Sequence, residues 1–437
     1  MTDSLPEPDQ SASRLTPVLM LAYHFPPENE SGAARPGRFY KYLPEFGYRP
    51  YVVAAGQPDS GSAERVYNVP NRFLVPSRNT LPGLTEMALR KFFFPQDAGV
   101  SWTLPAVSEA GKLIAAHSIR LMISTAPPFT TAIAALRLKQ RYGLKWIADF
   151  RDPLVGNPFR VQRGLPGQVN KLLESMIFRR ADALVSVTDS ITEGWAREHP
   201  SYANKINLIC NGFDPAESFG PAQRVRRPYK ILSHVGAIMG GRHPIAILES
   251  IRRLIERGRM NPAEFRVRLT GVLEQQVFDL NPTVFTSLEE KGCLEYDEGV
   301  VPKAQAMQII AESDYLLLLD GNVRDLGFAI PAKFFDYVRA GRPMLVQTAR
   351  NSPLDRTLPN CGVPSLFVYP TDSEERIDSQ VVALFNLPTD PIEPSPWFWT
   401  RFDGRKQTGA LARILDELLR VESGSTTYPE SVCSDGA

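Results

Sequence analysis

The sequence predicts two doubly wound α/β domains, each built around a mostly parallel sheet. The chain has 437 residues, which is more than one ordinary domain contains. Short β-type runs alternate with helical patterns in two series, and several runs are continuously apolar, as in parallel strands covered on both faces. Residues 211–230, rich in glycine, proline and charge, separate the two series and are typical of a domain boundary.

The first series lies within the predicted N-terminal domain, residues 16–212. Its expected strands are Val18–Tyr23, Tyr51–Ala55, Leu121–Ser124, Trp146–Phe150, Ala183–Val187 and Ile206–Ile209, with helices that include Thr130–Tyr142 and Lys171–Arg180. The second series lies within the predicted C-terminal domain, residues 213–404. Its expected strands are Ile231–Val235, Phe265–Leu269, Tyr315–Leu319, Met344–Gln347 and Leu366–Tyr369, with helices Ile245–Arg257, Ala304–Ser313 and Ala332–Ala340. The polar ends, residues 1–15 and 422–437, are expected to be disordered.

Composition indicates a reduced, cytoplasmic globular protein. A formal net charge of +1 gives no reason to expect a nucleic-acid partner. The four cysteines are scattered without metal-ligand spacing, at Cys210, Cys293, Cys361 and Cys433. The start lacks the pattern of a signal peptide, and no stretch approaches the ~20 apolar residues of a membrane span.

The first expected strand runs into an unusual loop, YHFPPENESGAARPGRFYKYLPEFGY (residues 23–48). Two prolines give an extended exit, and Gly32 permits close approach of the backbone to another group. A helix is predicted over residues 33–46. Its free N–H groups, with Gly32 and Arg35 beside them, could hold a phosphate or a sugar. A plain N-terminal cap, with Arg35 paired to a surface carboxylate, is an equally open interpretation.

A second glycine-rich turn occurs in ILSHVGAIMGGRHP (residues 231–244). A strand ends at Val235 and is followed by a turn, a cation and a new helix start; the turn contains Gly236, Gly240, Gly241 and Arg242. The planar guanidinium of Arg242 suits phosphate. His234 and His243 flank the turn without metal-type partners, and we interpret both as structural.

A third candidate segment is IPAKFFDYVRAGRPMLV (residues 330–346), which predicts a helix that starts at Pro331 and ends at Gly341. Lys333 in the first turn could reach a phosphate or a sugar hydroxyl. Asp336 has two open interpretations. It could complement the helix dipole, or it could accept hydrogen bonds from the two hydroxyls of a ribose.

Polar residues at the ends of other strands are further candidates for the acceptor or sugar side. They are Asp149, Arg151 and Asp152 in ADFRDP, Ser124 at the end of the preceding strand, and His24 and Arg35 in the opening loop. The alternative for ADFRDP is an ion pair between Arg151 and a carboxylate that holds the strand end. The aromatic run at residues 91–95 could contact a membrane surface or a lipid-linked acceptor, or could be core beneath a loop.

Six motifs, in this order and spacing, resemble the family-4-type glycosyltransferases, and most closely a bacterial subgroup of polysaccharide and glycoconjugate assembly. They are the opening loop, ADFRDP, NGFD (211–214), VGAIMGGR (235–242), EGVVP (298–302) and PAKFFDYVRAGRPML (331–345). The resemblance runs from about Val18 to about Leu419. It implies the GT-B fold: two Rossmann-like domains facing a cleft, and a C-terminal helix, at about residues 405–421, that crosses back to the N-terminal domain.

The resemblance also implies an activity. The enzyme would move a sugar, with retention of configuration, from a nucleotide-sugar to a glycan, lipid-linked or small-molecule acceptor. It would need no metal and no other cofactor. A cytoplasmic location is expected from the composition, and the aromatic run at residues 91–95 adds peripheral contact with the inner membrane surface as a further expectation.

Motif position implies the roles of individual residues. Gly32 and the glycines of the second turn would approach the donor, Arg242 and Lys333 would neutralise its diphosphate, and Asp336 would bind the ribose. The family's usual acidic pair is Glu, seven residues, Glu. Here Phe328 occupies the first place and Asp336 the second, which leaves the contact to the donor sugar open.

Two alternatives remain open from the sequence. One is a sugar-nucleotide 2-epimerase of the same fold, although the motif order fits it less well. The other is a degenerate subunit that binds nucleotide-sugars without turnover, which Phe328 favours and the set of Arg242, Lys333 and Asp336 opposes. The products of a reaction with a nucleotide-sugar distinguish the three.

Overall fold

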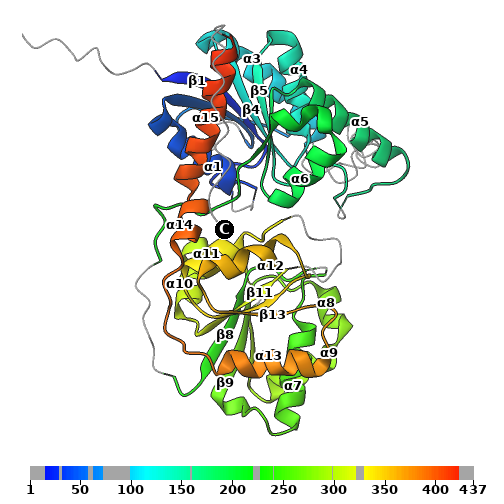
Figure 1. Ribbon diagram of the computed structural model, residues 1–437, viewed down its shortest axis with the longest axis vertical. Coiled ribbons are helices and arrows are strands. Elements are labelled where there is room, and N and C mark those ends of the chain that lie inside the picture. The colour runs from blue at the N-terminus through cyan, green and yellow to red at the C-terminus, as the bar shows by residue number, and fades with distance from the viewer. Residues whose placement is uncertain are drawn as a thin grey trace, which may run out of the picture. The chain divides into compact units, whose positions relative to one another are not determined.

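The computed structural model describes most of the chain (Figure 1). The described residues are 15–28, 32–57, 63–71, 99–157, 160–219, 227–239, 241–297, 299–320 and 329–422. Several positions singled out in the sequence lie outside these ranges: both termini, the aromatic run at 91–95, Gly240 and Phe328.

Contacts divide the chain into two compact units. The first unit comprises the residues up to Ser186, the segment His199–Ile209 and the residues from Gln407 onward, and the second comprises Val187–Glu198 and Cys210–Lys406. The domain boundaries derived from the sequence stay a prediction. Helix α6 (Asp189–Glu198) belongs to the second unit, where Asp189 forms an ion pair of 3.1 Å with Arg401.

The first unit has a parallel sheet in which β1 lies between β2 and β4. Within the described residues its order is β3-β2-β1-β4-β5-β6-β7. The strands are β1 (Thr16–Ala22), β2 (Tyr48–Ala55), β3 (Val66–Val69), β4 (Leu121–Ala126), β5 (Lys145–Phe150), β6 (Ala183–Ser186) and β7 (Ile206–Leu208). Val18, Met20 and Ala22 face one side of β1, Leu19 and Leu21 face the other, and all five are buried. Burial on both faces explains the uninterrupted apolar run.

Helices cover this sheet. They are α1 (Ala34–Tyr42), continued by η1 (Leu43–Phe46), then η2 (Val100–Trp102), α3 (Thr103–His117), α4 (Thr130–Tyr142), α5 (Gly164–Arg180), η3 (Pro200–Lys205) and the last helix, α15 (Gly404–Glu422). Leu411 and Leu415 of α15 pack into the same core cluster as Val18 of β1 and Phe39 of α1. Tyr48 at the start of β2 also donates a hydrogen bond to Asp416. The last helix is therefore an integral layer of the first unit.

The second unit repeats the architecture with a second parallel sheet. Its order within the described residues is β10-β9-β8-β11-β12-β13. The strands are β8 (Lys230–Val235), β9 (Phe265–Thr270), β10 (Leu294–Asp297), β11 (Tyr315–Leu319), β12 (Met344–Gln347) and β13 (Ser365–Val368). Helices α7 (Ile245–Glu256), α9 (Pro282–Glu290) and α13 (Glu374–Phe385) share one apolar core cluster with β8 and β9. The other helical elements are η4 (Pro262–Glu264), α8 (Gln275–Leu280), α10 (Lys303–Glu312), α11 (Lys333–Arg339), α12 (Pro353–Thr357), η5 (Leu358–Cys361) and α14 (Pro396–Arg401).

The predicted fold class is confirmed: each unit is a doubly wound α/β structure with a parallel sheet. Every strand expected from the sequence is present, with ends that differ by three residues or fewer. The predicted helix over residues 33–46 divides into α1 and a 3-10 turn at Leu43, because Pro44 lacks the N–H that an α-helix would need there.

Candidate active site

In a parallel α/β sheet, ligands bind beyond the carboxyl ends of the strands. In the second unit this edge carries the turn that follows β8 and the first turn of α11. Gly236 has a φ of 114°, a backbone conformation that glycine adopts readily and other residues rarely adopt. A Cβ atom there would lie 2.4 Å from Cε of Lys333. The glycine therefore lets the stem of Lys333 pass directly against the backbone of the turn.

Two neutral acceptors hold the ammonium group of Lys333. Its Nζ lies 3.0 Å from Nε2 of His234 and 3.2 Å from the carbonyl oxygen of Ala237. Among the residues that the structure describes, no carboxylate forms an ion pair with Lys333 or with Arg242. An ammonium group has three N–H donors, so a third hydrogen bond of Lys333 is left for a ligand or for water.

The geometry fixes the protonation of His234. Its Nδ1 lies 2.9 Å from the carbonyl oxygen of Leu317, which can only accept, so Nδ1 carries the proton. Nε2 therefore accepts from Lys333. Burial, first, and the charge of Lys333, second, lower the pKa of His234 to about 3, so the imidazole is neutral.

The surroundings of Lys333 disfavour the charged form of its amino group. Burial lowers the pKa of Lys333 to about 8, and the positive charge of Arg242 contributes in the same direction. The backbone N–H of Arg242 donates to the carbonyl oxygen of Met239 at 3.1 Å, and the charge of Arg242 acts on Lys333. Two cations close together, without a carboxylate partner among the described residues, form a place where an anion is favoured.

Helix α11 is fixed to the sheet behind these cations. The backbone N–H of Val235 donates to the hydroxyl of Tyr337 at 2.8 Å, and Tyr337 is fully buried. Asp336 is partly exposed, one turn after Lys333, and forms an ion pair of 3.6 Å with Arg339 on the same helix. Gly341, with a φ of 66°, ends the helix as the sequence predicted.

Asp320 lies at the end of β11 but supports the strand edge. It is buried and accepts a hydrogen bond of 3.0 Å from the hydroxyl of Thr348. Gly241 is partly buried beside Arg242. His243 is partly buried, and Gln347 donates to its carbonyl oxygen at 2.9 Å, a structural contact.

In the first unit, the carboxyl ends of β1, β4 and β5 carry the other predicted residues. Gly32 lies against Arg151: a Cβ atom at Gly32 would be 2.3 Å from Nη1 of Arg151. Nη2 of Arg151 donates to the carbonyl oxygen of Pro127, and its Nε has no hydrogen-bond partner among the described residues. Burial lowers the pKa of Arg151, which the charges of Asp152 and Asp149 oppose. The structure thus brings Gly32 and Arg151 together.

Arg35 and Asp149 bind each other. Nε of Arg35 donates to Oδ2 of Asp149 at 2.9 Å and Nη2 donates to Oδ1 at 2.8 Å, and both residues are buried. The sequence suggested a ligand contact or a surface carboxylate for Arg35, and an ion pair between Arg151 and a carboxylate. The carboxylate that Arg35 binds is the buried one of Asp149 and not a surface one, and Asp149 pairs with Arg35 and not with Arg151.

Two other predicted acceptor-side residues have partners within the protein. Ser124 is buried, and its hydroxyl accepts a hydrogen bond of 2.9 Å from Nε1 of Trp146. We therefore reassign Ser124 to the support of β4 and β5. His24 is partly exposed, and its Nδ1 lies 3.1 Å from Oε2 of Glu28 in the same loop. Asp152 is partly buried beside Arg151.

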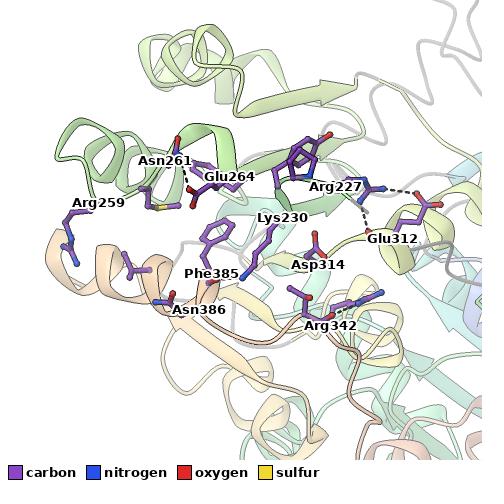
Figure 2. Close-up of a pocket in the computed structure, with 16 residues that line it drawn as sticks. Arg227, Lys230, Arg259, Asn261, Glu264, Glu312, Asp314, Arg342, Phe385 and Asn386 are labelled. Atoms are coloured by element: carbon purple, nitrogen blue, oxygen red, sulfur yellow. Dashed lines mark hydrogen bonds and ion pairs between the residues drawn. The ribbon is translucent and has the colours of Figure 1, made fainter. Parts of the chain in front are cut away.

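A cavity of about 680 Å³ lies at the opposite edge of the second sheet (Figure 2). Its lining includes Lys230 at the start of β8, Phe265 at the start of β9 and Asp314 just before β11. Two cationic groups of its wall are engaged by the protein. Lys230 donates to the carbonyl oxygen of Phe385 (2.7 Å), and Arg227 interacts with Glu312. This position does not fit the ligand edge of a doubly wound sheet.

Within the described residues, no group of three or more His, Cys, Asp or Glu side chains could hold a metal ion. No described helix has the length and apolar character that a membrane crossing requires.

Comparison with known proteins gives a family match and a fold match. Residues 37–217 match the model of Glycosyltransferase Family 4. No curated protein matches the sequence.

Three solved structures are similar over almost the whole chain. Sucrose-phosphate synthase from Thermosynechococcus elongatus has a TM-score of 0.60 and 14% identity, with 94% of this chain and 100% of that chain covered. Anabaena HepE in complex with UDP and glucose has a TM-score of 0.61 and 12% identity, with 92% and 100% covered. The lipopolysaccharide outer core galactosyltransferase WaaB, in its apo form, has a TM-score of 0.56 and 12% identity, with 92% and 100% covered.

At these identities the structural likeness shows the fold, which is GT-B. The family match adds the class of enzyme. The family match over residues 37–217 and the GT-B fold together support a glycosyltransferase enzyme, as the resemblance in its sequence implied.

Proposed function

We propose that this enzyme transfers a sugar from a nucleotide-sugar donor to a glycan, lipid-linked or small-molecule acceptor, with retention of configuration, in polysaccharide or glycoconjugate assembly. The observation that carries the proposal is the pair of cations at the carboxyl edge of the second sheet. Lys333 has only neutral acceptors among the described residues, and Arg242 lies near enough to lower its pKa. Such a site favours a diphosphate.

The role of the two cations in sugar transfer follows from where negative charge develops during the reaction. When the bond from the sugar C1 to the phosphate oxygen breaks, negative charge grows on the departing nucleoside diphosphate. Preplaced cations stabilise that charge more in the transition state than in the ground state, which lowers the barrier. We assign this role to Arg242 and Lys333, and we assign contact with the ribose to Asp336.

Without a covalent glycosyl-enzyme intermediate, retention requires the acceptor hydroxyl to attack from the face that the phosphate leaves. A bond then forms between C1 and the acceptor oxygen, and the proton of the hydroxyl passes to an oxygen of the departing phosphate. This route needs neither a protein base nor a metal ion. On the side of the first unit we assign Gly32 and Arg151 to the sugar or acceptor, with Asp152 and His24 as further candidates and Arg35 and Asp149 in support.

Nucleotide binding is the first test. UDP, GDP, ADP, CMP and dTDP would each be added without metal, and the melting temperature measured. UDP is the leading candidate because the similar Anabaena HepE structure is a complex with UDP and glucose. A ligand at 100 times its dissociation constant stabilises the folded state by about 2.7 kcal/mol, enough for a clear shift. The shift should disappear in Lys333→Met and persist in Lys303→Met, a control in the exposed first turn of α10.

Product analysis then separates the activities. A new glycoside supports the proposal, whereas an epimerised donor or a bound but unchanged donor contradicts it. An enzyme that binds no nucleotide would overturn the donor site.

A further inference from the structure

We propose that His234 is a positioning residue for the donor diphosphate: its buried neutral imidazole holds the ammonium group of Lys333 under the Gly236 turn while leaving its charge intact. The inference rests on the proposed function and adds to it a residue that the sequence analysis interpreted as structural. His234 lies on β8, two residues before Gly236, and has no solvent exposure.

The first argument is the direction of the two hydrogen bonds. Because the carbonyl oxygen of Leu317 can only accept, Nδ1 of His234 donates to it and Nε2 has a free lone pair for Lys333. The ring thereby links the central strand β11 to the ammonium group through two hydrogen bonds of fixed direction. Lys333 cannot turn away from this acceptor without leaving a buried ring nitrogen unsatisfied, which is costly.

The second argument is the charge of the acceptor. A buried carboxylate at position 234 would hold Lys333 equally well but would cancel its charge. The neutral ring and the neutral carbonyl of Ala237 fix the ammonium group and leave a net positive charge. They also use two of its three donors, so the geometry leaves one donor for an oxygen of the ligand.

The third argument is the space around the lysine. Gly236 gives the Lys333 stem passage, since a side chain at that position would meet Cε at 2.4 Å. Tyr337, one turn further along α11, is bonded to the backbone of Val235, so the helix that carries Lys333 cannot slide along β8. Strand, turn and helix therefore all restrict the ammonium group to one place, which is the preorganisation that phosphate stabilisation needs.

Two amide variants separate positioning from simple packing. The terminal amide of His234→Gln reaches the place of Nε2 and can accept from Lys333. The shorter amide of His234→Asn reaches the place of Nδ1 and can donate to Leu317, but it leaves Lys333 without its acceptor. Calorimetric affinities for UDP, GDP and ADP, with the matching nucleosides as controls, would be measured together with the melting temperature of each ligand-free variant.

We expect His234→Asn to bind the preferred diphosphate at least about tenfold more weakly, since a hydrogen bond to a charged group is worth ~1.5–3 kcal/mol. His234→Gln should retain affinity within about threefold, and neither variant should change the affinity for the nucleoside. Wild-type affinity in His234→Asn, or equal losses in both variants that follow their melting temperatures, would overturn the role of His234 alone. Wild-type protein that binds none of the diphosphates would instead overturn the proposed function, and this role with it.

Discussion

Arg35 and Asp149, which are 114 positions apart in the sequence, form a buried pair with three hydrogen bonds from Nε and Nη2 of the guanidinium to both carboxylate oxygens. The side chains have relative exposures of 2% and 0%. The pair joins the start of α1 to the end of β5, so it fixes the loop that contains Gly32 to the strand end that carries Arg151. The pair thereby holds two candidate site residues, Gly32 and Arg151, in place relative to each other.

Asp149→Asn should destabilise the first unit strongly. Removing one partner of a buried ion pair leaves an uncompensated charge, which costs about 3–5 kcal/mol. Denaturant unfolding measures the loss, and Lys112→Gln is the matched control, since its exposed pair with Glu109 on α3 should contribute under ~1 kcal/mol. Equal effects of the two substitutions would show that the buried pair does not stabilise the loop.

The glycine of the same loop gives a second prediction. In Gly32→Val the new Cβ would lie 2.3 Å from Nη1 of Arg151, so the arginine must move. We expect a folded protein whose sugar transfer falls by about a hundredfold or more, because small displacements at a reacting centre are that costly. Gly194→Ala, in open space on α6, is the control and should remain active. An active Gly32→Val variant would remove this loop from the site.

The sequence predicted the buried strands because an apolar run such as Tyr315–Leu319, of five residues, is short for a helix and fits a strand covered on both faces. It missed β3 (Val66–Val69) and β10 (Leu294–Asp297), each of which lies at one of the two edges of its sheet. Edge strands bury less surface, so VYNV and LEYD carry polar residues and lack the apolar pattern. The local pattern of apolar residues therefore indicates which segments are buried. It indicates which segments pair as strands only where the paired strands are also buried.

The candidate site likewise contains features that the sequence predicted and features that it did not. Glycine-rich turns and helix starts, such as those at Gly236 and Lys333, are local and were found from the sequence. The partners of Lys333 and Arg35 are not local: His234 and Asp149 lie 99 and 114 positions away. Nothing in the sequence near His234 indicates that its ring is neutral or which nitrogen carries the proton. Contacts of that kind depend on the tertiary fold, so His234 was assigned to structure alone.

Nucleoside diphosphate binding should depend on pH through Lys333. Its pKa is about 8 in the free protein, lowered from 10.5 by burial and by Arg242, and a bound diphosphate must raise it. Binding therefore takes up a proton above pH ~8, and affinity should fall as the pH rises from 8 toward 10, by up to about tenfold per unit. Calorimetry at pH 7, 8, 9 and 10 measures this trend. Lys333→Met should bind more weakly at pH 7 and lose the decline, and an unchanged decline would assign it to another group.

The same group has the opposite effect on folding. Because the pKa of Lys333 is lower in the folded protein than the ordinary value of 10.5, its charge opposes folding below pH ~8. This penalty should diminish as the pH rises from 8 to 10.5. The free energy of unfolding of the wild type, measured with denaturant and without ligand, should therefore increase relative to that of Lys333→Met over that range. A difference that stays constant with pH would mean that Lys333 is not buried as a cation.

Gly236→Ala tests the turn itself. At a φ of 114° an alanine is strained, and its Cβ would lie 2.4 Å from Cε of Lys333, so the lysine must leave the acceptors His234 and Ala237. Gly258→Ala separates these causes, because Gly258 also has a positive φ, 64°, but a Cβ there meets nothing within 4 Å. Both variants should lose about 1 kcal/mol or more of stability from the backbone, whereas only Gly236→Ala should lose affinity for the diphosphate, by at least about tenfold. If both kept full affinity, the passage of Lys333 beneath the turn would not matter for the ligand, and the cation pair would have to be assigned to the structure of the second unit.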